Sequence, residues 1–149
     1  MLNMPQTTPR HQSEIRVIYG DTDQLGMVYY GRYLEYFERA RGELLRSVGL
    51  VYRELEVAGL YLPVTHCRID YRAPARYDDL LQLSCWAERE SHWRLRLRLP
   101  VTIHCGETLI CEGYTEHLVT DGQGRPLRPR GAQARLLATL TERLFAEGR

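Results

Sequence analysis

The feature that most constrains how this chain can fold is a turn-forming segment that runs directly into an amphipathic helical pattern. Residues 20–26 (GDTDQLG) are mainly acids, glycines and other turn formers, and no apolar period crosses them. The next residues have the i, i+3, i+4, i+7 spacing of a helix with one buried face. The apolar positions are Tyr30, Tyr33, Leu34, Phe37, Ala40, Leu44, Leu45 and Val48. With Gly49 as a C-terminal cap, the pattern predicts one long helix from Tyr30 to Val48.

Most of the remaining chain is predicted to form strands. Two shorter helices are expected at 50–58 and 132–145, and the strand candidates are 14–19, 60–72, 80–89, 93–105 and 107–120. In the segment 93–105, leucines alternate with arginines, so we expect the leucine face to meet the long helix. The order of elements predicts an α+β protein in which an antiparallel sheet packs against one helix.

Two prolines qualify the strand predictions. Pro63 cannot donate to a sheet ladder, so its strand is expected to lie at an edge or to contain a bulge. Pro100 falls on the polar face of the strand at 93–105 and predicts a local bulge there. Because such a sheet has two open edges, pairing of edges between subunits is a natural way to cover them, and we expect an oligomer.

Length and charge narrow the classes of protein. With 149 residues, the chain is expected to form a single domain over residues 1–149, with a frayed N-terminus at 1–13 and a C-terminal helix within 131–149. A net charge of +1 gives no reason to expect nucleic acid or a membrane as a partner, and the stripe of Arg94, Arg96 and Arg98 is better explained as a solvated or subunit-facing surface. The N-terminus lacks the apolar core of a secretory signal, which favours a cytoplasmic protein.

The cysteines and histidines do not form a metal-binding pattern. Cys67, Cys85, Cys105 and Cys111 lie in apolar or alternating segments, as buried free thiols do. Two of them follow a histidine directly, but adjacent strand residues point to opposite faces of a sheet and cannot easily share one metal ion. We therefore expect no metal site.

Chemistry is most plausible where the turn meets the long helix. The first N–H groups of a helix have no intrahelical partner, so those near Tyr29, Tyr30 and Gly31 could hold an oxyanion or a polarised carbonyl. A carboxylate of the turn, Asp23 above all, would face the same volume. On composition alone, however, Asp21 and Asp23 are better explained as turn formers that bond their own backbone.

The same residues resemble the signature of a known enzyme family. The segment 20–41, with Asp21-Thr22-Asp23, Gly26, Val28-Tyr29-Tyr30, Tyr33 and Phe37-Glu38-Arg39-Ala40-Arg41, resembles the hot-dog-fold acyl-CoA thioesterases. Within that family it is similar to the 4-hydroxybenzoyl-CoA thioesterases and to the acyl-CoA thioesterases associated with the Tol–Pal system. The resemblance extends over about residues 14 to 130. It implies an antiparallel sheet wrapped around one long central helix, in dimers joined by edge pairing that often form tetramers.

The resemblance also implies roles for particular residues. Asp23 matches the catalytic carboxylate, as nucleophile or as general base, and Tyr30 matches the position whose backbone N–H polarises the thioester carbonyl; Asp21 would brace the turn. Substrate binding would involve Gly26 and Tyr29 of the motif, Leu62, Pro63 and Val64 at the acyl group, and Ser91, His92 and Trp93 at coenzyme A. No cofactor is implied, since coenzyme A is part of the substrate.

Two departures from the family pattern affect the expected substrate. Tol–Pal-associated relatives usually have histidine where this chain has Tyr30, and 4-hydroxybenzoyl-CoA thioesterases usually have proline where it has Gln24. We therefore expect a thioesterase for a short-chain or aromatic acyl-CoA, with acyl carrier protein as another candidate carrier of the acyl group. The alternative is a non-catalytic hot-dog module that binds acyl-CoA or acyl carrier protein. The presence of Asp23 favours the enzyme.

Overall fold

The computed structural model describes residues 10–91, 96–128 and 130–145. Its helices are α1 (Arg32–Ser47), α2 (Tyr52–Val57) and α3 (Ala132–Phe145). Its strands are β1 (His11–Arg16), β2 (Val64–Tyr71), β3 (Leu80–Cys85), β4 (Glu88–Ser91), β5 (Arg96–Cys105) and β6 (Thr108–Leu118). They form one antiparallel sheet in the order β1-β3-β5-β6-β2, in which β4 pairs with β5 beyond the end of β3.

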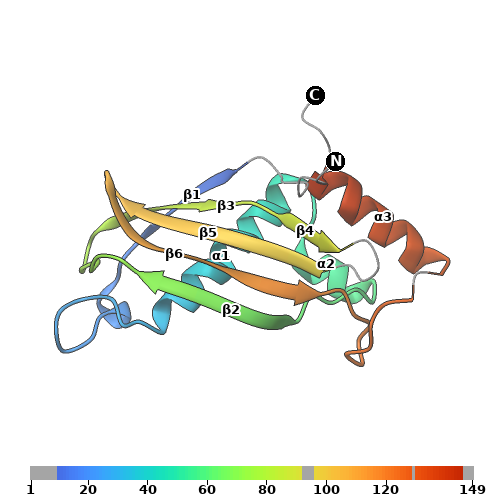
Figure 1. Cartoon of the computed structure of the whole chain (residues 1–149), viewed down its shortest axis with the longest axis horizontal. Helices are drawn as coiled ribbons and strands as arrows, with labels where there is room; N and C mark the ends of the chain where they lie inside the picture. The colour runs from blue at the N-terminus through green and yellow to red at the C-terminus, as the bar shows by residue number, and fades with distance from the viewer. Residues whose placement is uncertain (1–9, 92–95, 129, 146–149) are drawn as a thin grey trace.

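The sheet curves around α1, which lies across one of its faces (Figure 1). Most of the predicted apolar stripe is buried, with Phe37 and Leu45 fully enclosed. Tyr30 and Leu34 are instead exposed, and Tyr36, which the pattern did not include, is buried. The described part of the leucine face of β5 meets it: Leu97, Leu99 and Ile103 are each at most 1% exposed. The central helix and the sheet around it confirm the fold class predicted from the sequence.

Two predictions about the β1–β3–β5 side of the sheet need correction. Residues His11–Ser13, expected in a frayed terminus, form the first half of β1, because they pair with Cys85–Leu83 of β3. The strand also ends at Arg16 rather than at Tyr19, which begins a short 3-10 helix, Tyr19–Asp21. The predicted strand 80–89 is interrupted at Trp86 and Ala87, which separate β3 from β4.

That interruption also explains Pro100, at which the ladder between β5 and β6 shows no bulge. Pro100 lies opposite the break between β3 and β4, where the regular ladder needs no N–H donor from it. Its carbonyl accepts a hydrogen bond from the N–H of Trp86 (3.3 Å). The irregularity predicted for the proline's own strand therefore falls on the neighbouring strand.

The strand after Pro63 has both of the features predicted for it. β2 is an edge strand, and its pairing with β6 shifts register between Val64 and His66. Because β2 has a neighbour on one side only, most of its residues are exposed. Cys67 is consequently exposed, against the prediction of a buried thiol, and Cys105 is only partly buried.

The other two cysteines are buried, and burial raises the pKa of the Cys85 and Cys111 thiols to about 12. Both are therefore neutral at pH 7 and poor nucleophiles. Within the described ranges, no group of three or more His, Cys, Asp or Glu side chains is arranged to hold a metal ion. No helix in the described part of the chain is long and apolar enough to cross a membrane.

Candidate active site

Asp23 closes a tight turn with its own carboxylate. Its backbone N–H donates to Met27 (2.8 Å), and its Oδ1 accepts hydrogen bonds from the N–H groups of Leu25 (2.9 Å) and Met27 (3.4 Å). Gly26 occupies the left-handed region at φ 77°, where a side chain would be strained, and its N–H donates to the Asp23 carbonyl (3.0 Å). Asp23 is thus the turn former that composition suggested. Its Oδ2, however, accepts no hydrogen bond from the described residues.

Asp21 has a different role, which agrees with the expectation that it braces the turn. Its Oδ2 accepts a hydrogen bond from the Tyr36 hydroxyl (2.7 Å), and its carbonyl accepts one from the N–H of Tyr29 (2.8 Å). Burial, followed by the bond to Asp21, raises the pKa of the Tyr36 hydroxyl well above its usual value, which keeps it protonated as a donor. The carboxylate of Asp21 thereby ties the turn to the buried face of α1.

Where the turn meets α1, two backbone N–H groups make no hydrogen bond to any residue that the structure describes. The helix begins at Arg32, two residues later than predicted, and Gly31 is its N-cap. The N–H of Tyr29 donates to the Asp21 carbonyl, and the N–H of Arg32 donates to the Tyr29 carbonyl (2.9 Å). Between them, the N–H groups of Tyr30 and Gly31 donate to no described residue. These two groups, at the positive end of the helix, can receive an oxyanion.

Tyrosine rings surround this helix start. The rings of Tyr29 and Tyr30 lie 4.5 Å apart and are 45% and 64% exposed. At the end of β2, the hydroxyl of Tyr71 donates to the carbonyl of Tyr30 (3.0 Å), and its ring lies 5.4 Å from that of Tyr33. The start of α1 is therefore fixed to the edge strand, with an exposed aromatic surface beside the free N–H groups.

The predicted acyl-site residues Leu62, Pro63 and Val64 lie at the other end of the sheet. Val64 pairs with His117 and Tyr71 with Cys111, so Val64 and the Tyr30 region stand at opposite ends of β2. Eight strand residues span about 23 Å. Leu62 is buried in the core of its own chain, whereas Pro63 and Val64 are exposed. A single chain does not bring these residues to Asp23.

Ser91, the one described residue of the predicted coenzyme A turn, lies at that same far end. Ser91 ends β4 and pairs with Arg96 of β5, whose other neighbour is Leu118 of β6 (Figure 1). His92 and Trp93 lie outside the described residues, as does the side chain of Ser91. Their expected contact with coenzyme A remains a prediction.

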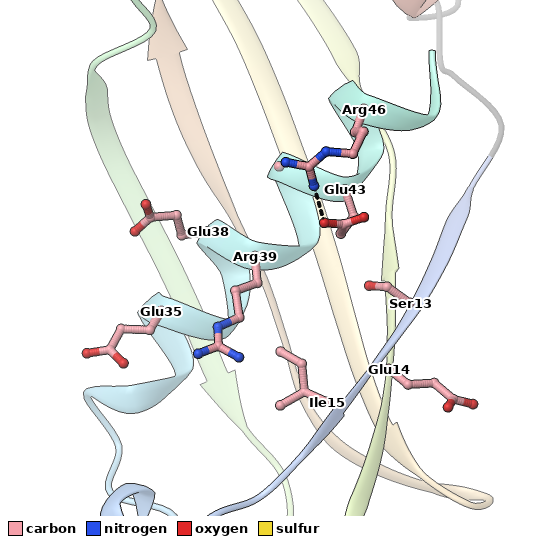
Figure 2. A pocket seen from close by; sticks show the side chains of 9 residues that line it. Ser13, Glu14, Ile15, Glu35, Glu38, Arg39, Glu43 and Arg46 are labelled. Atoms are coloured by element: carbon pink, nitrogen blue, oxygen red, sulfur yellow. Dashed lines mark hydrogen bonds and ion pairs between the residues drawn. The ribbon is translucent and has the colours of Figure 1, made fainter. Parts of the chain in front are cut away.

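A groove of about 640 Å³ between β1 and α1 contains none of the predicted site residues. Figure 2 shows Ser13 and Ile15 of β1 pointing toward α1, whereas Glu14 of β1 and Glu35 and Glu38 of α1 point away from the opposite element. Its charged groups are four carboxylates and two guanidinium groups, and Arg46 is paired with Glu43. They are Glu14, Glu35, Glu38, Glu43, Arg39 and Arg46. None of the residues that line the groove belongs to the Asp23 turn.

One buried polar cluster was not predicted from the sequence. His117 is 1% exposed and hydrogen-bonds to Thr115 and to the Leu62 carbonyl, which also accepts from Tyr52. Thr115 and His117 are two residues apart on one strand, so alternation could have placed them on the same face. Their distant partners, Leu62 and Tyr52, left no such signal.

Comparison with known proteins relates this chain to thioesterases. Residues 17–143 match the family described as the Thioesterase-like superfamily. YneP of Bacillus subtilis, named provisionally as an acyl-CoA thioesterase, is 29% identical over 122 residues, which cover 81% of this chain and 88% of that protein. The acyl-CoA thioesterase YbgC of Haemophilus influenzae is 46% identical over 70 residues, 46% of this chain and 52% of that one.

Solved structures share the fold. The structure of a probable thioesterase from Bartonella henselae superimposes with a TM-score of 0.74 and 32% identity, covering 82% of this chain and all (100%) of that chain. The likeness extends well beyond the segment around Asp23, because it includes the sheet and the central helix together.

Proposed function

This chain belongs to the thioesterase-like superfamily, and on that premise we propose that it hydrolyses an acyl-CoA thioester to the free acid and coenzyme A. The observation that carries the proposal is the pairing of two features in one short segment. Asp23 has a carboxylate oxygen that the turn does not use, and the helix start after it has two free N–H groups, of Tyr30 and Gly31.

In the proposed reaction, the thioester carbonyl oxygen is bound by the N–H of Tyr30, and that of Gly31 is a second donor. These donors stabilise the negative charge that develops on the oxygen when the carbonyl carbon is attacked. Asp23 Oδ2 either removes a proton from an attacking water or attacks the carbon itself to form an anhydride that water then opens. In both routes the C–S bond breaks, and the coenzyme A thiolate leaves and takes up a proton.

The complete site in this proposal needs two subunits. If β2 pairs antiparallel with β2 of a second chain, the Pro63 and Val64 end of one strand lies beside the Tyr71 end of the other. Residues 62–64 of one subunit would then line the acyl site of its partner. The exposed edge of β2 and the separation of the two groups of residues within one chain support this arrangement. Pairing of such dimers into tetramers is part of the same proposal.

The tyrosine surface beside the start of α1 indicates which kind of acyl group the site could bind. The exposed rings of Tyr29, Tyr30 and Tyr71, of which the first two are tilted by 46° to each other, provide an aromatic surface that suits a short or aromatic acyl group. The names of YneP and YbgC support coenzyme A as the carrier. Acyl carrier protein is the alternative carrier, and the same thioester chemistry would serve either.

The proposal is tested by following release of free thiol from acyl-CoA esters that range from short aliphatic to aromatic. Asn in place of Asp23 keeps an Oδ1 for the turn but removes the carboxylate, and Asp121→Asn is the matched control, because Asp121 closes a turn with the same hydrogen bonds. Of these two variants, we expect only Asp23→Asn to lose thioesterase activity. If the wild type binds acyl-CoA but hydrolyses no ester of the panel, the non-catalytic module becomes the better account.

The two-subunit site has its own test. Asp23→Asn and Val64→Arg are each expected to be inactive as homodimers, because one removes the carboxylate and the other blocks the acyl site. After unfolding and refolding together, mixed dimers have one site in which both residues are wild type. Recovery of activity supports the shared site, whereas mixtures that stay inactive contradict it.

A further inference from the structure

The carbonyl oxygen of Leu62 is held by two side chains from distant parts of the chain. The hydroxyl of Tyr52, on α2, donates to it at 3.1 Å, and Nδ1 of His117, on β6, lies 2.8 Å away. Because a carbonyl can only accept, His117 must carry its proton on Nδ1. Two donors on one oxygen satisfy both of its lone pairs and restrict its position.

His117 is itself fixed by a third residue. Its Nε2 lies 2.8 Å from Oγ1 of Thr115, and since Nδ1 holds the proton of the neutral ring, the Thr115 hydroxyl donates to Nε2. Burial, opposed by the bond to Leu62 and aided by the nearby Arg41 cation, lowers the pKa of His117 to about 4. The imidazole is therefore neutral at pH 7, in the one tautomer that satisfies both neighbours.

This cluster acts where the sheet ladder is irregular. Tyr61 exchanges two backbone hydrogen bonds with Thr120, both 2.9 Å long, whereas farther along, the β2–β6 register shifts between Val64 and His66. Pro63, between these points, has no N–H to donate. The side chains of Tyr52 and His117 thus hold the Leu62 carbonyl in a stretch that the regular ladder does not fix.

We propose that Tyr52 and His117 are positioning residues that hold segment 62–64 in place as one wall of the acyl site. The inference rests on the proposed function, in which this segment meets the acyl group. His117 is buried and does not touch substrate; it acts through Leu62. We call the two side chains and the Leu62 carbonyl that they hold the clamp. The clamp sets how far the exposed Pro63 and Val64 project, and thereby which acyl groups fit.

The first test uses two variants that each remove one hydroxyl. Tyr52→Phe deletes one donor to Leu62, and Thr115→Val deletes the donor that orients His117. Tyr114→Phe and Thr102→Val are matched controls, because their hydroxyls make no hydrogen bond to any described residue. All four proteins and the wild type are assayed with saturated acyl-CoA esters from acetyl upward.

The expected result is a split between KM and kcat. For esters long enough to reach the wall, loss of one hydrogen bond raises KM about fivefold in the two clamp variants, while kcat for acetyl-CoA stays within about twofold of wild type. The controls leave both constants unchanged. A merely structural role would change all esters alike, and that result would overturn the inference.

The second readout does not depend on activity. In hydrogen–deuterium exchange, the amides of Val64 to His66 should exchange faster in Tyr52→Phe than in Tyr114→Phe, with the rest of β2 unchanged. Unchanged exchange in an active enzyme overturns the clamp and leaves the proposed function intact. A wild type that hydrolyses no thioester overturns the acyl-wall role together with the proposed function, even where exchange responds to the variants.

Discussion

Two turns of this protein have the same backbone design and different surroundings. Asp23 and Asp121 each accept, at Oδ1, the N–H groups two and four residues later, and each is followed three residues on by a glycine in the left-handed region, at φ 77° for Gly26 and 78° for Gly124. The backbone hydrogen bonds also match. The aspartate N–H donates to the carbonyl four residues later at 2.8 Å in the first turn and 2.9 Å in the second, and the glycine N–H donates to the aspartate carbonyl at 3.0 and 3.1 Å.

The two turns differ in the structure to which each one leads. The Asp23 turn leads within nine residues to α1, with the N–H groups of Tyr30 and Gly31 unused. The Asp121 turn returns to the sheet, where Leu127 donates to Val119 (3.0 Å), and α3 begins only at Ala132. An aspartate that closes a turn is therefore weak evidence for catalysis by itself. The nearby unpaired donors distinguish the first turn from the second.

The largest expected effect separates the two aspartates directly. Asp23→Asn should lower kcat by about 10²- to 10⁴-fold, the range found for a missing acid–base group, while Asp121→Asn keeps wild-type activity. Thermal unfolding should show that both variants fold, since Asn retains Oδ1. Equal activities for the two variants would erase the distinction between the turns.

The next prediction removes a donor that only the first turn has nearby. Gly31 has φ −69°, which proline can adopt, so Gly31→Pro deletes its N–H with little change in backbone angle. We expect kcat to fall about 10²-fold, as for loss of an oxyanion donor.

Gly31→Ala is the control for that variant. Its Cβ would lie 3.0 Å from the Tyr29 ring, so it reproduces the crowding but keeps the N–H. If Gly31→Ala loses as much activity as Gly31→Pro, crowding accounts for the effect and Gly31 is not a donor.

A third prediction expects the two turns to respond alike in stability and differently in function. Gly26→Ala and Gly124→Ala each force a side chain into the left-handed region and should each lower the free energy of unfolding by about 1 kcal/mol. Only Gly26→Ala should also impair hydrolysis, because only its turn carries Asp23. Urea unfolding and the thiol-release assay measure the two effects separately.

The smallest effect concerns acid. Hydrogen bonds from the N–H groups of Arg125 and Gln123 lower the pKa of Asp121 below its usual value. A carboxyl whose pKa is lower in the folded state stabilises the fold above its unfolded pKa, near ~3.9, and loses that contribution as pH falls through the folded pKa. The stability difference between wild type and Asp121→Asn should therefore be larger at pH 7 than at pH 2. A difference that grows in acid would contradict this origin.

Local patterns predicted much of the fold. The bounds of α3, Ala132–Phe145, and the alternation of Leu97 with Arg98 in β5 agree with the structure. So does most of the apolar spacing of α1, in which Leu34 is exposed and Tyr36 takes its place on the buried face. Predictions failed where distant pairing decided the outcome. Residues 11–13 looked frayed because nothing near them in sequence shows that β3 is their partner, and the break at Trp86 became intelligible only opposite Pro100.

The sequence by itself determined the turn at Asp23, the helix after it and the buried faces, because these depend on residues within a few positions of one another. Only the tertiary structure decided that the Tyr29 N–H is used while those of Tyr30 and Gly31 are free, and that Val64 stands at the far end of β2. It also joined Tyr52, Leu62 and His117 at one carbonyl. These relations depend on sheet register and helix packing, which bring together residues up to 65 positions apart in the sequence and which short-range periodicity does not encode.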